Sequence, residues 1–172
     1  MYKYLLYFLI FSFLGWCAEV LFHALKSGRF VNRGLGRVPF CPVYGVGICL
    51  CSLLLGGVRS FVLLALLSMA IATAVELAVG YLADRLLGCR LWDYSGEKGN
   101  ILGYVCPRFS LVWGVACAAV IKTLPLVDSM IKSLDTPIFK GVAFVLLVTV
   151  LVDERISMTK PKAQVKAQVK AQ

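Results

Sequence analysis

The chain has 172 residues, of which 60% are hydrophobic and only 16% are charged, and its mean hydropathy is +0.84. Soluble domains carry about 25% charged residues, so this composition excludes a soluble globular protein and indicates an integral membrane protein. The net charge of +9 does not indicate nucleic-acid binding, because the basic residues lie in short segments between apolar runs and at the end of the chain.

Five apolar runs predict an all-α fold, a polytopic bundle of five transmembrane helices, since about 20 apolar residues are needed to cross a bilayer as a helix. The expected spans are residues 4–25, 38–58, 60–83, 105–126 and 137–152. The fifth is the shortest, because only residues 141–152 are free of charge. We expect one transmembrane domain over residues 1–155, followed by a basic low-complexity tail over residues 156–172.

The first span carries a polar stripe. Its members recur at helical spacing and are Ser12, Gly15, Glu19, His23 and Lys26. Ionisable groups at membrane depth are costly and tend to mark a pathway or a site, so Glu19 is a candidate binding residue. His23, the only histidine, lies one turn away; we expect it to hydrogen-bond Glu19 and include it among the candidate substrate-binding residues.

The segment after the first span, residues 28–42, is rich in Gly, Arg and Pro. This composition predicts a structured loop, which can dip into the membrane where protein covers its backbone. Asn32 and Arg33 are its candidate binding residues. The three arginines, Arg29, Arg33 and Arg37, either clamp an anionic group or serve orientation and pair with the buried glutamates.

The third span repeats the pattern, with Thr73, Glu76, Gly80 and Asp84 on one face. Glu19 precedes Lys26 by seven residues, and Glu76 precedes Asp84 by eight. At 1.5 Å per residue, both carboxylates are expected about 10–12 Å inside the same side of the membrane. Two interpretations stay open: the glutamates share a polar pocket, or each bonds a neighbouring helix or an arginine.

The loop after the third span, residues 91–100, holds two aromatic residues typical of the membrane interface, Trp92 and Tyr94. Its polar candidates are Asp93 and Asn100. A Cys-Pro pair follows each loop, at Cys41 and at Cys106. These parallels suggest an internal repeat in which spans one and two correspond, in parallel orientation, to spans three and four.

The distribution of Lys and Arg predicts the orientation. With five spans, five basic residues fall on one side of the membrane and 13 on the other, the second set including both loops and the tail. The positive-inside rule places that set in the cytoplasm, so the N-terminus is expected outside and the C-terminus inside. Arg108 and Lys122 are expected to reach towards opposite faces. The repeat of period four over residues 160–172 predicts a solvated tail, with anchoring to anionic lipid as the alternative.

The sequence lacks the motifs typical of several kinds of binding site and catalytic site. The seven cysteines are odd in number and contain no CxxC pair, so neither a disulfide framework nor a zinc site is indicated. There is no GxxxxGK[ST], HExxH or GxSxG, so P-loop ATP binding and the common hydrolase signatures are missing. We expect no cofactor or metal, and an enzymatic activity is not the first expectation.

Several short motifs occur together in order: Gly15-Trp16-x-x-Glu19, Phe30-Val-Asn-Arg-Gly34, Cys41-Pro-Val-Tyr-Gly45, Trp92-Asp-Tyr-Ser95, Asn100-Ile-x-Gly103 and Trp113-Gly114. Over about residues 1–150 this combination resembles the family of small bacterial membrane proteins called "Putative ABC-transporter type IV", or CmpB-like permeases. Leu35-Gly-Arg-Val-Pro39 departs from the Leu-x-Gly-Pro run expected of the family. The resemblance implies an inner-membrane permease that works with a separate ATPase, and it implies no substrate.

We therefore expect a small transport protein, homo-oligomeric or hetero-oligomeric, that moves a small polar or charged solute. Its pocket would be lined by two intramembrane glutamates and capped by residues of the two loops. The candidate substrate-binding residues are Glu19, Glu76, Asn32, Arg33, Asp93, Asn100 and His23. The alternatives are a membrane enzyme acting on a lipid or lipid-linked substrate, with the carboxylates as acid and base, and a structural or regulatory membrane subunit.

Overall fold

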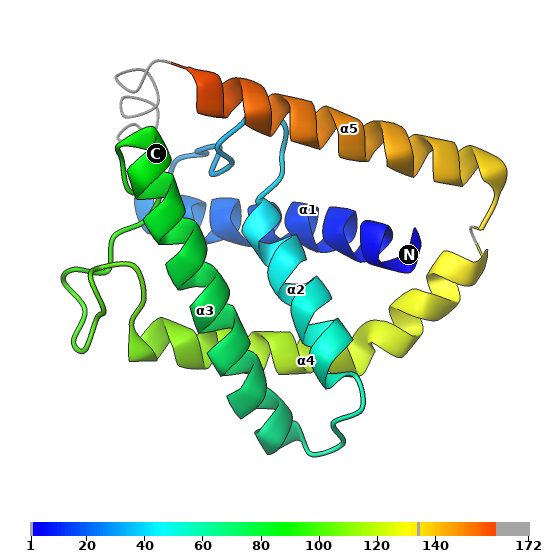
Figure 1. Ribbon diagram of the computed structural model, residues 1–172, viewed down its shortest axis with the longest axis horizontal. Helices are drawn as coiled ribbons and strands as arrows, with labels where there is room; N and C mark the ends of the chain where they lie inside the picture. Colours follow the sequence, from blue (N-terminus) through cyan, green and yellow to red (C-terminus); the bar gives the residue numbers. More distant parts are fainter. Residues whose placement is uncertain (1, 134, 161–172) are drawn as a thin grey trace.

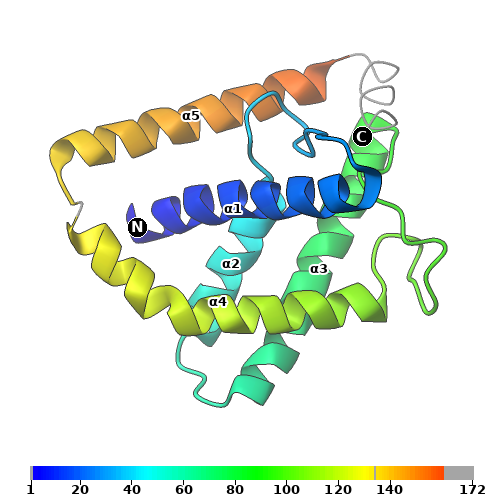
Figure 2. The same ribbon diagram turned by 180° about the vertical axis from the view of Figure 1, so that it is seen from behind.

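The computed structural model describes residues 2–133 and 135–160, and it confirms the all-α class. Its five helices are α1 (Tyr2–Ser27), α2 (Pro42–Leu55), α3 (Phe61–Leu87), α4 (Pro107–Ser133) and α5 (Pro137–Thr159). In Figures 1 and 2, α1, α4 and α5 run roughly along the long axis, and α2 and α3 cross it obliquely. The repeat expected for the tail, residues 160–172, lies outside the described residues apart from Lys160.

Three of the five helices, α1, α3 and α4, are long and apolar enough to cross a membrane. This establishes a multi-pass membrane protein, with fewer full-length spans than the five expected. α2 is a shorter apolar helix of 14 residues, which is about 21 Å long. α5 is not among the candidate spans of the described chain, because charged residues stand at Lys140 and again from Asp153 to Arg155.

The two loops meet at one end of the molecule. The end of α1, the end of α3, the start of α4 and the end of α5 all gather there, on the left of Figure 1 and the right of Figure 2. We call this the loop end. Gly88 terminates α3 there in the left-handed conformation, and its N–H donates to the carbonyl of Asp84.

The first loop turns back along α1 before α2 begins. The backbone N–H of Cys41 donates to the carbonyl of Ser12 at 3.0 Å, and Ser12 lies 15 residues, about 22 Å, before the last residue of α1. α2 therefore starts deep in the molecule, beside the middle of α1, and is about half as long as α1. The expected span over residues 38–58 began four residues too early, since Pro39 and Pro42 keep the chain irregular up to this point.

Small residues allow the helices to approach closely where they cross. A Cβ atom at Gly114 of α4 would lie 2.7 Å from the carbonyl oxygen of Ala65 in α3, and α3 and α4 form the most extensive helix pair. α4 changes direction near Pro125 (Figure 1), where the proline ring removes a backbone hydrogen bond and bends the helix. Lys122 reaches the α2–α3 connection, where its ammonium donates to the carbonyl of Arg59 at 2.7 Å.

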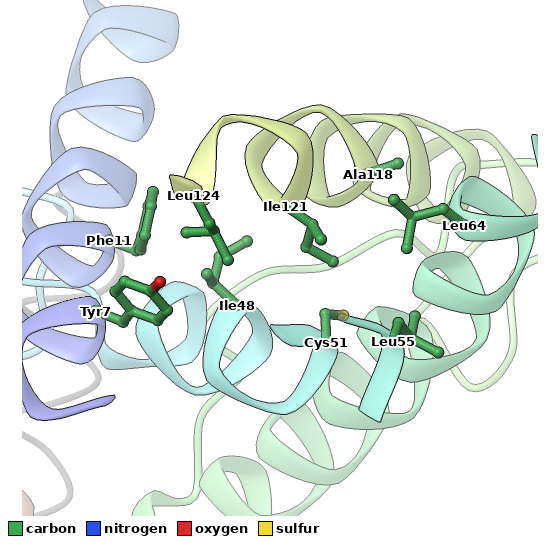
Figure 3. Close-up of a cluster of buried hydrophobic side chains, with 9 residues drawn as sticks. All are labelled: Tyr7, Phe11, Ile48, Cys51, Leu55, Leu64, Ala118, Ile121 and Leu124. Carbon is green, nitrogen blue, oxygen red and sulfur yellow. The ribbon is translucent and has the colours of Figure 1, made fainter. Parts of the chain in front are cut away.

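One apolar cluster joins four of the helices. It is drawn in Figure 3 and consists of Tyr7, Phe11, Ile48, Cys51, Leu55, Leu64, Ala118, Ile121 and Leu124. The side chains of α1, α2, α3 and α4 interdigitate there, so this cluster fixes the four helices relative to one another.

α5 packs against α1, and hydrogen bonds connect it to the first loop at the loop end. Ala143 and Val150 pack with Leu6 and Leu9 of α1. The Asp153 carboxylate accepts from the backbone N–H groups of Arg37 and Val38, at 2.6 and 3.0 Å. The first loop is thus held between α1 and the end of α5.

We predict that the α1–α2 crossing tolerates no side chain at Gly45. An alanine Cβ there would lie 2.5 Å from the carbonyl oxygen of Phe8, so Gly45→Ala should destabilise the protein by about 1–3 kcal/mol through overpacking. The measurement is thermal unfolding of the purified protein in one detergent.

Gly47→Ala is the matched control. Gly47 is also buried on α2, but nothing lies within 4 Å of its Cβ position, so alanine should be neutral or stabilise the helix by up to about 1 kcal/mol. Equal melting temperatures for the two variants would contradict the crossing described here.

Candidate functional site

Glu19 is held by two groups from the chain that follows α1. The Tyr44 hydroxyl donates a hydrogen bond to Oε1 of Glu19, and Nε of Arg33 lies 3.7 Å from Oε2. Arg33 is mostly buried, with 15% of its side chain exposed. The carboxylate is therefore paired with a cation and hydrogen-bonded, as a charge at membrane depth requires.

The sequence around Gly15 explains why Tyr44 reaches Glu19. A Cβ atom at Gly15 would collide with the ring of Tyr44, so only glycine lets the ring lie against α1 one turn before the glutamate. Tyr44 sits in the first turn of α2, and the return of the first loop to Ser12 places that turn beside Ser12 and Gly15, from where the Tyr44 hydroxyl reaches Glu19.

Glu76 has a similar partner in the second loop. The Tyr94 hydroxyl donates to Oε1 of Glu76 at 2.9 Å, and the Tyr94 ring stacks on Phe109 with centroids 4.8 Å apart. Burial raises the pKa of Tyr94, and the nearby Glu76 carboxylate adds to the shift, so the hydroxyl remains a donor. Glu76 is only 8% exposed, and its second oxygen, Oε2, is buried without a partner in the described chain.

Two aromatic side chains bring the glutamates into one cluster. The ring of Tyr44 packs edge-on against Trp113 of α4, with centroids 5.2 Å apart. Trp113 lies beside the Glu76 carboxyl group, and Glu19 is near enough to interact with that group electrostatically. We call Glu19, Tyr44, Trp113, Glu76 and Tyr94 the glutamate cluster. Its two acids come from different helices, eight residues before the end of α1 and eleven before the end of α3, so their depths relative to the helix ends differ more than expected.

Both loop asparagines use their side-chain amides to hydrogen-bond the backbone of their own loops. Oδ1 of Asn32 accepts from the Trp16 indole at 2.7 Å and from the Gly34 N–H at 3.0 Å. Oδ1 of Asn100 accepts from the Gly103 N–H, and its Nδ2 donates to the carbonyls of Ser95 and Glu97. These bonds occupy the amides, so the structure gives them a role in loop folding.

Asp93 lies apart from the glutamate cluster, whereas His23 lies within electrostatic range of Glu19 and Arg33. Asp93 is exposed and closes a turn by accepting from the N–H and hydroxyl of Ser95, while Arg90 pairs with it at 3.1 Å. The Ser95 hydrogen bonds, with Arg90, lower the pKa of Asp93. Among the described residues no hydrogen bond joins His23 to Glu19: Tyr44 and Arg33 hold the carboxylate, and the imidazole contacts the ring of Phe22.

Four residues at or beside this cluster were not among the candidates. Tyr44 and Trp113 belong to the Cys-Pro-Val-Tyr-Gly and Trp-Gly motifs, which could have indicated them, and Tyr94 was interpreted as an interfacial aromatic. Glu154 near the end of α5 gave no sequence signal, because it stands in a run of charges. It lies near Cys41, as Glu19 does, and its Oε1 is buried without a partner in the described chain.

We predict that Asn32 holds the first loop closed. In Asn32→Ala the Trp16 indole and the Gly34 N–H lose their acceptor, which should cost about 1–2 kcal/mol and raise the open population of the loop roughly 5–30-fold. Trypsin cleavage after Arg29 or Arg37, both exposed, should accelerate accordingly, as measured by mass spectrometry on purified protein.

Asn32→Asp serves as the matched control. It keeps the Oδ1 acceptor and loses only the 3.3 Å bond from Nδ2 to the Gly36 carbonyl, so its cleavage should stay within a few-fold of wild type. If alanine and wild type are cleaved at the same rate, Asn32 does not hold the loop.

Comparison with known proteins agrees with the motifs described above. Residues 6–158 match the family described as "Putative ABC-transporter type IV". No match was found among curated proteins or solved structures. Because the matched segment covers most of the 172 residues and includes every member of the glutamate cluster, this membrane protein belongs to the Putative ABC-transporter type IV family.

Proposed function

We propose that the protein is a permease subunit that moves a small polar or charged solute past the glutamate cluster. The observation that carries the proposal is the convergence of two intramembrane carboxylates from α1 and α3 on one aromatic contact, Tyr44 with Trp113. Ionisable groups that face the interior of a membrane bundle are a recurrent feature of solute and ion pathways.

The irregular segment between α1 and α2 supports this function. The first loop returns about 22 Å along α1, and α2 then begins inside the molecule. Transporters commonly build their sites near the bilayer midplane from such discontinuous helices. Irregular backbone at this depth is tolerated where protein covers it or where it lines a cavity.

The charge balance narrows the class of solute. Glu19, Glu76 and the nearby Glu154 provide three carboxyl groups, and Arg33 is the one cation paired with them among the described residues. Buried charge that is left uncompensated is costly. The cluster therefore favours a cationic or neutral polar solute over an anion.

We further propose the orientation and assembly that the sequence suggests. The loop end would face the cytoplasm, with the N-terminus outside, because the excess of Lys and Arg falls in the two loops and beyond α5. The protein would act as a homo-oligomer or hetero-oligomer with a separate ATPase subunit, and the parallels between its two loops would reflect an internal repeat.

The test is a comparison of solute transport by wild type and by the Glu19→Gln, Glu76→Gln double variant. Each is expressed in a bacterial strain lacking the native gene, and uptake and export of labelled cations, amino acids and sugars are measured by mass spectrometry. If the flux of a solute depends on the wild-type protein, that flux should be at least about tenfold lower with the double variant, because the charges that attract the solute are gone.

Glu97→Gln is the control. Glu97 lies in the second loop, pairs with Arg108 at 3.6 Å and is 36% exposed, so its loss should leave transport within twofold of wild type. Full flux in the double variant would overturn the proposal. A large loss of thermal stability without loss of flux would point to a structural subunit, and turnover of a lipid substrate by the purified protein in detergent would point to an enzyme.

A further inference from the structure

A second feature, independent of the glutamate cluster, lies where α3 meets the second loop. A hollow of about 530 Å³ opens there, a size typical of small-ligand sites. Its lining residues include Tyr81, Asp84, Arg85, Arg90 and Tyr104, together with the apolar Leu102. Neither Glu19 nor Glu76 lines it, and the function proposed above makes no use of it.

The hollow holds one paired and one unpaired arginine. Arg90 lies over the ring of Tyr104 at 5.1 Å and is paired with Asp84 at 3.6 Å and Asp93 at 3.1 Å. Arg85 lies over the ring of Tyr81 at 5.3 Å and has no carboxylate partner within 4.0 Å among residues 2–133 and 135–160. Its ring contact orients the guanidinium but leaves its charge unneutralised, so Arg85 is free to bind an anionic group.

Beside this charge, the second loop exposes two large apolar side chains. Ile101 is 54% exposed and Leu102 is 69% exposed. Leu102 has φ +53°, in the left-handed region that non-glycine residues rarely adopt. The bond from Ile101 N–H to the Val105 carbonyl and that from Gly103 N–H to Asn100 fix the turn in this conformation. Residues in sparsely populated backbone conformations cluster at active sites and ligand-binding sites, where the surrounding structure holds them.

The position of the hollow indicates which kind of ligand would match both the unpaired charge of Arg85 and the exposed apolar side chains beside it. Tyr81 and Arg85 stand on the last two turns of α3, a candidate membrane span, where Leu82 and Leu86 are exposed on the same helix end. Tyrosine and arginine beside exposed leucines at the end of a span are typical of the membrane interface, where lipid phosphates lie.

We propose that this hollow binds the phosphodiester headgroup of an anionic phospholipid. Arg85 pairs with the phosphate, Arg90 supplies further N–H donors from a fixed position, and Ile101 and Leu102 contact the acyl chains. A soluble phosphate compound offers the same charge, but it gives no reason for the exposed apolar pair. A docked protein would cover the pair without requiring a phosphate.

The experiment is native mass spectrometry of the full-length protein in detergent, titrated with short-chain phosphatidylglycerol or with phosphatidylcholine of the same chain length. Wild type should bind the first lipid at least fivefold more tightly. Arg85→Gln should weaken that binding at least fivefold and abolish the preference, because the unpaired charge is lost. Leu102→Gly should weaken it two- to threefold without lowering the melting temperature, since glycine suits the left-handed conformation.

Lys98→Gln is the matched control, an exposed cation of the same loop that does not line the hollow; it should stay within twofold of wild type. An equal loss in Lys98→Gln and Arg85→Gln would show diffuse surface attraction and overturn the site. Equal affinity for the two lipids would overturn the proposal that the hollow selects an anionic headgroup. It would favour a protein partner for the exposed apolar pair instead. Displacement of the lipid by millimolar inorganic phosphate would assign the hollow to a soluble phosphate and overturn its lipid source.

Discussion

A carboxylate inside a membrane helix must find its hydrogen-bond donors within the protein, because the hydrocarbon around it offers none. Glu19 and Glu76 both find a tyrosine hydroxyl, and neither tyrosine belongs to the helix that carries the glutamate. The chain has to come back to supply it. After α1 it returns to Ser12, and after α3 the second loop lies back on Gly80, where Trp92 and Tyr104 pack. The loops are therefore part of the membrane domain's interior structure.

This requirement explains why α2 is short. Residues 28–41 run back along α1 as irregular backbone, and the helix begins only at Pro42, where the chain has already reached the middle of α1. Such backbone needs polar partners of its own, which the Asn32 amide and the Asp153 carboxylate provide, and the Trp16 indole donates to Asn32 Oδ1. Glycine at positions 15 and 45 then lets α1 and α2 pack at the crossing. The polar residues of the loop are thus used mainly to hold its shape.

The sequence was sufficient to locate the helices but not the path between them. Apolar length and composition predicted the membrane class, and three members of the polar stripes, Glu76, Gly15 and Gly80, are buried. An apolar run such as residues 38–58 looks the same whether it spans fully or enters from a returning loop, because hydropathy does not record direction. The sequence also could not show what Asn32 and Asn100 bind. An asparagine in a loop looks the same in the sequence whether its amide bonds a solute or the backbone of its own loop.

The positions where pairing is incomplete are therefore the most informative ones. Several ionisable groups of the two loops are neutralised by a neighbour that the folding of the chain brings to them, as Arg33 is by Glu19 and Arg90 by Asp84 and Asp93. Among the described residues, Oε2 of Glu76 and Oε1 of Glu154 are buried without a hydrogen-bond partner, and the guanidinium of Arg85 lines a hollow with no carboxylate within 4.0 Å. The two acids lie inside the bundle and the arginine at its edge. Because these groups of opposite sign stand in two separate places, the two ligands proposed above, one inside the bundle and one at the lipid boundary, depend on different residues, and either proposal can fail without the other.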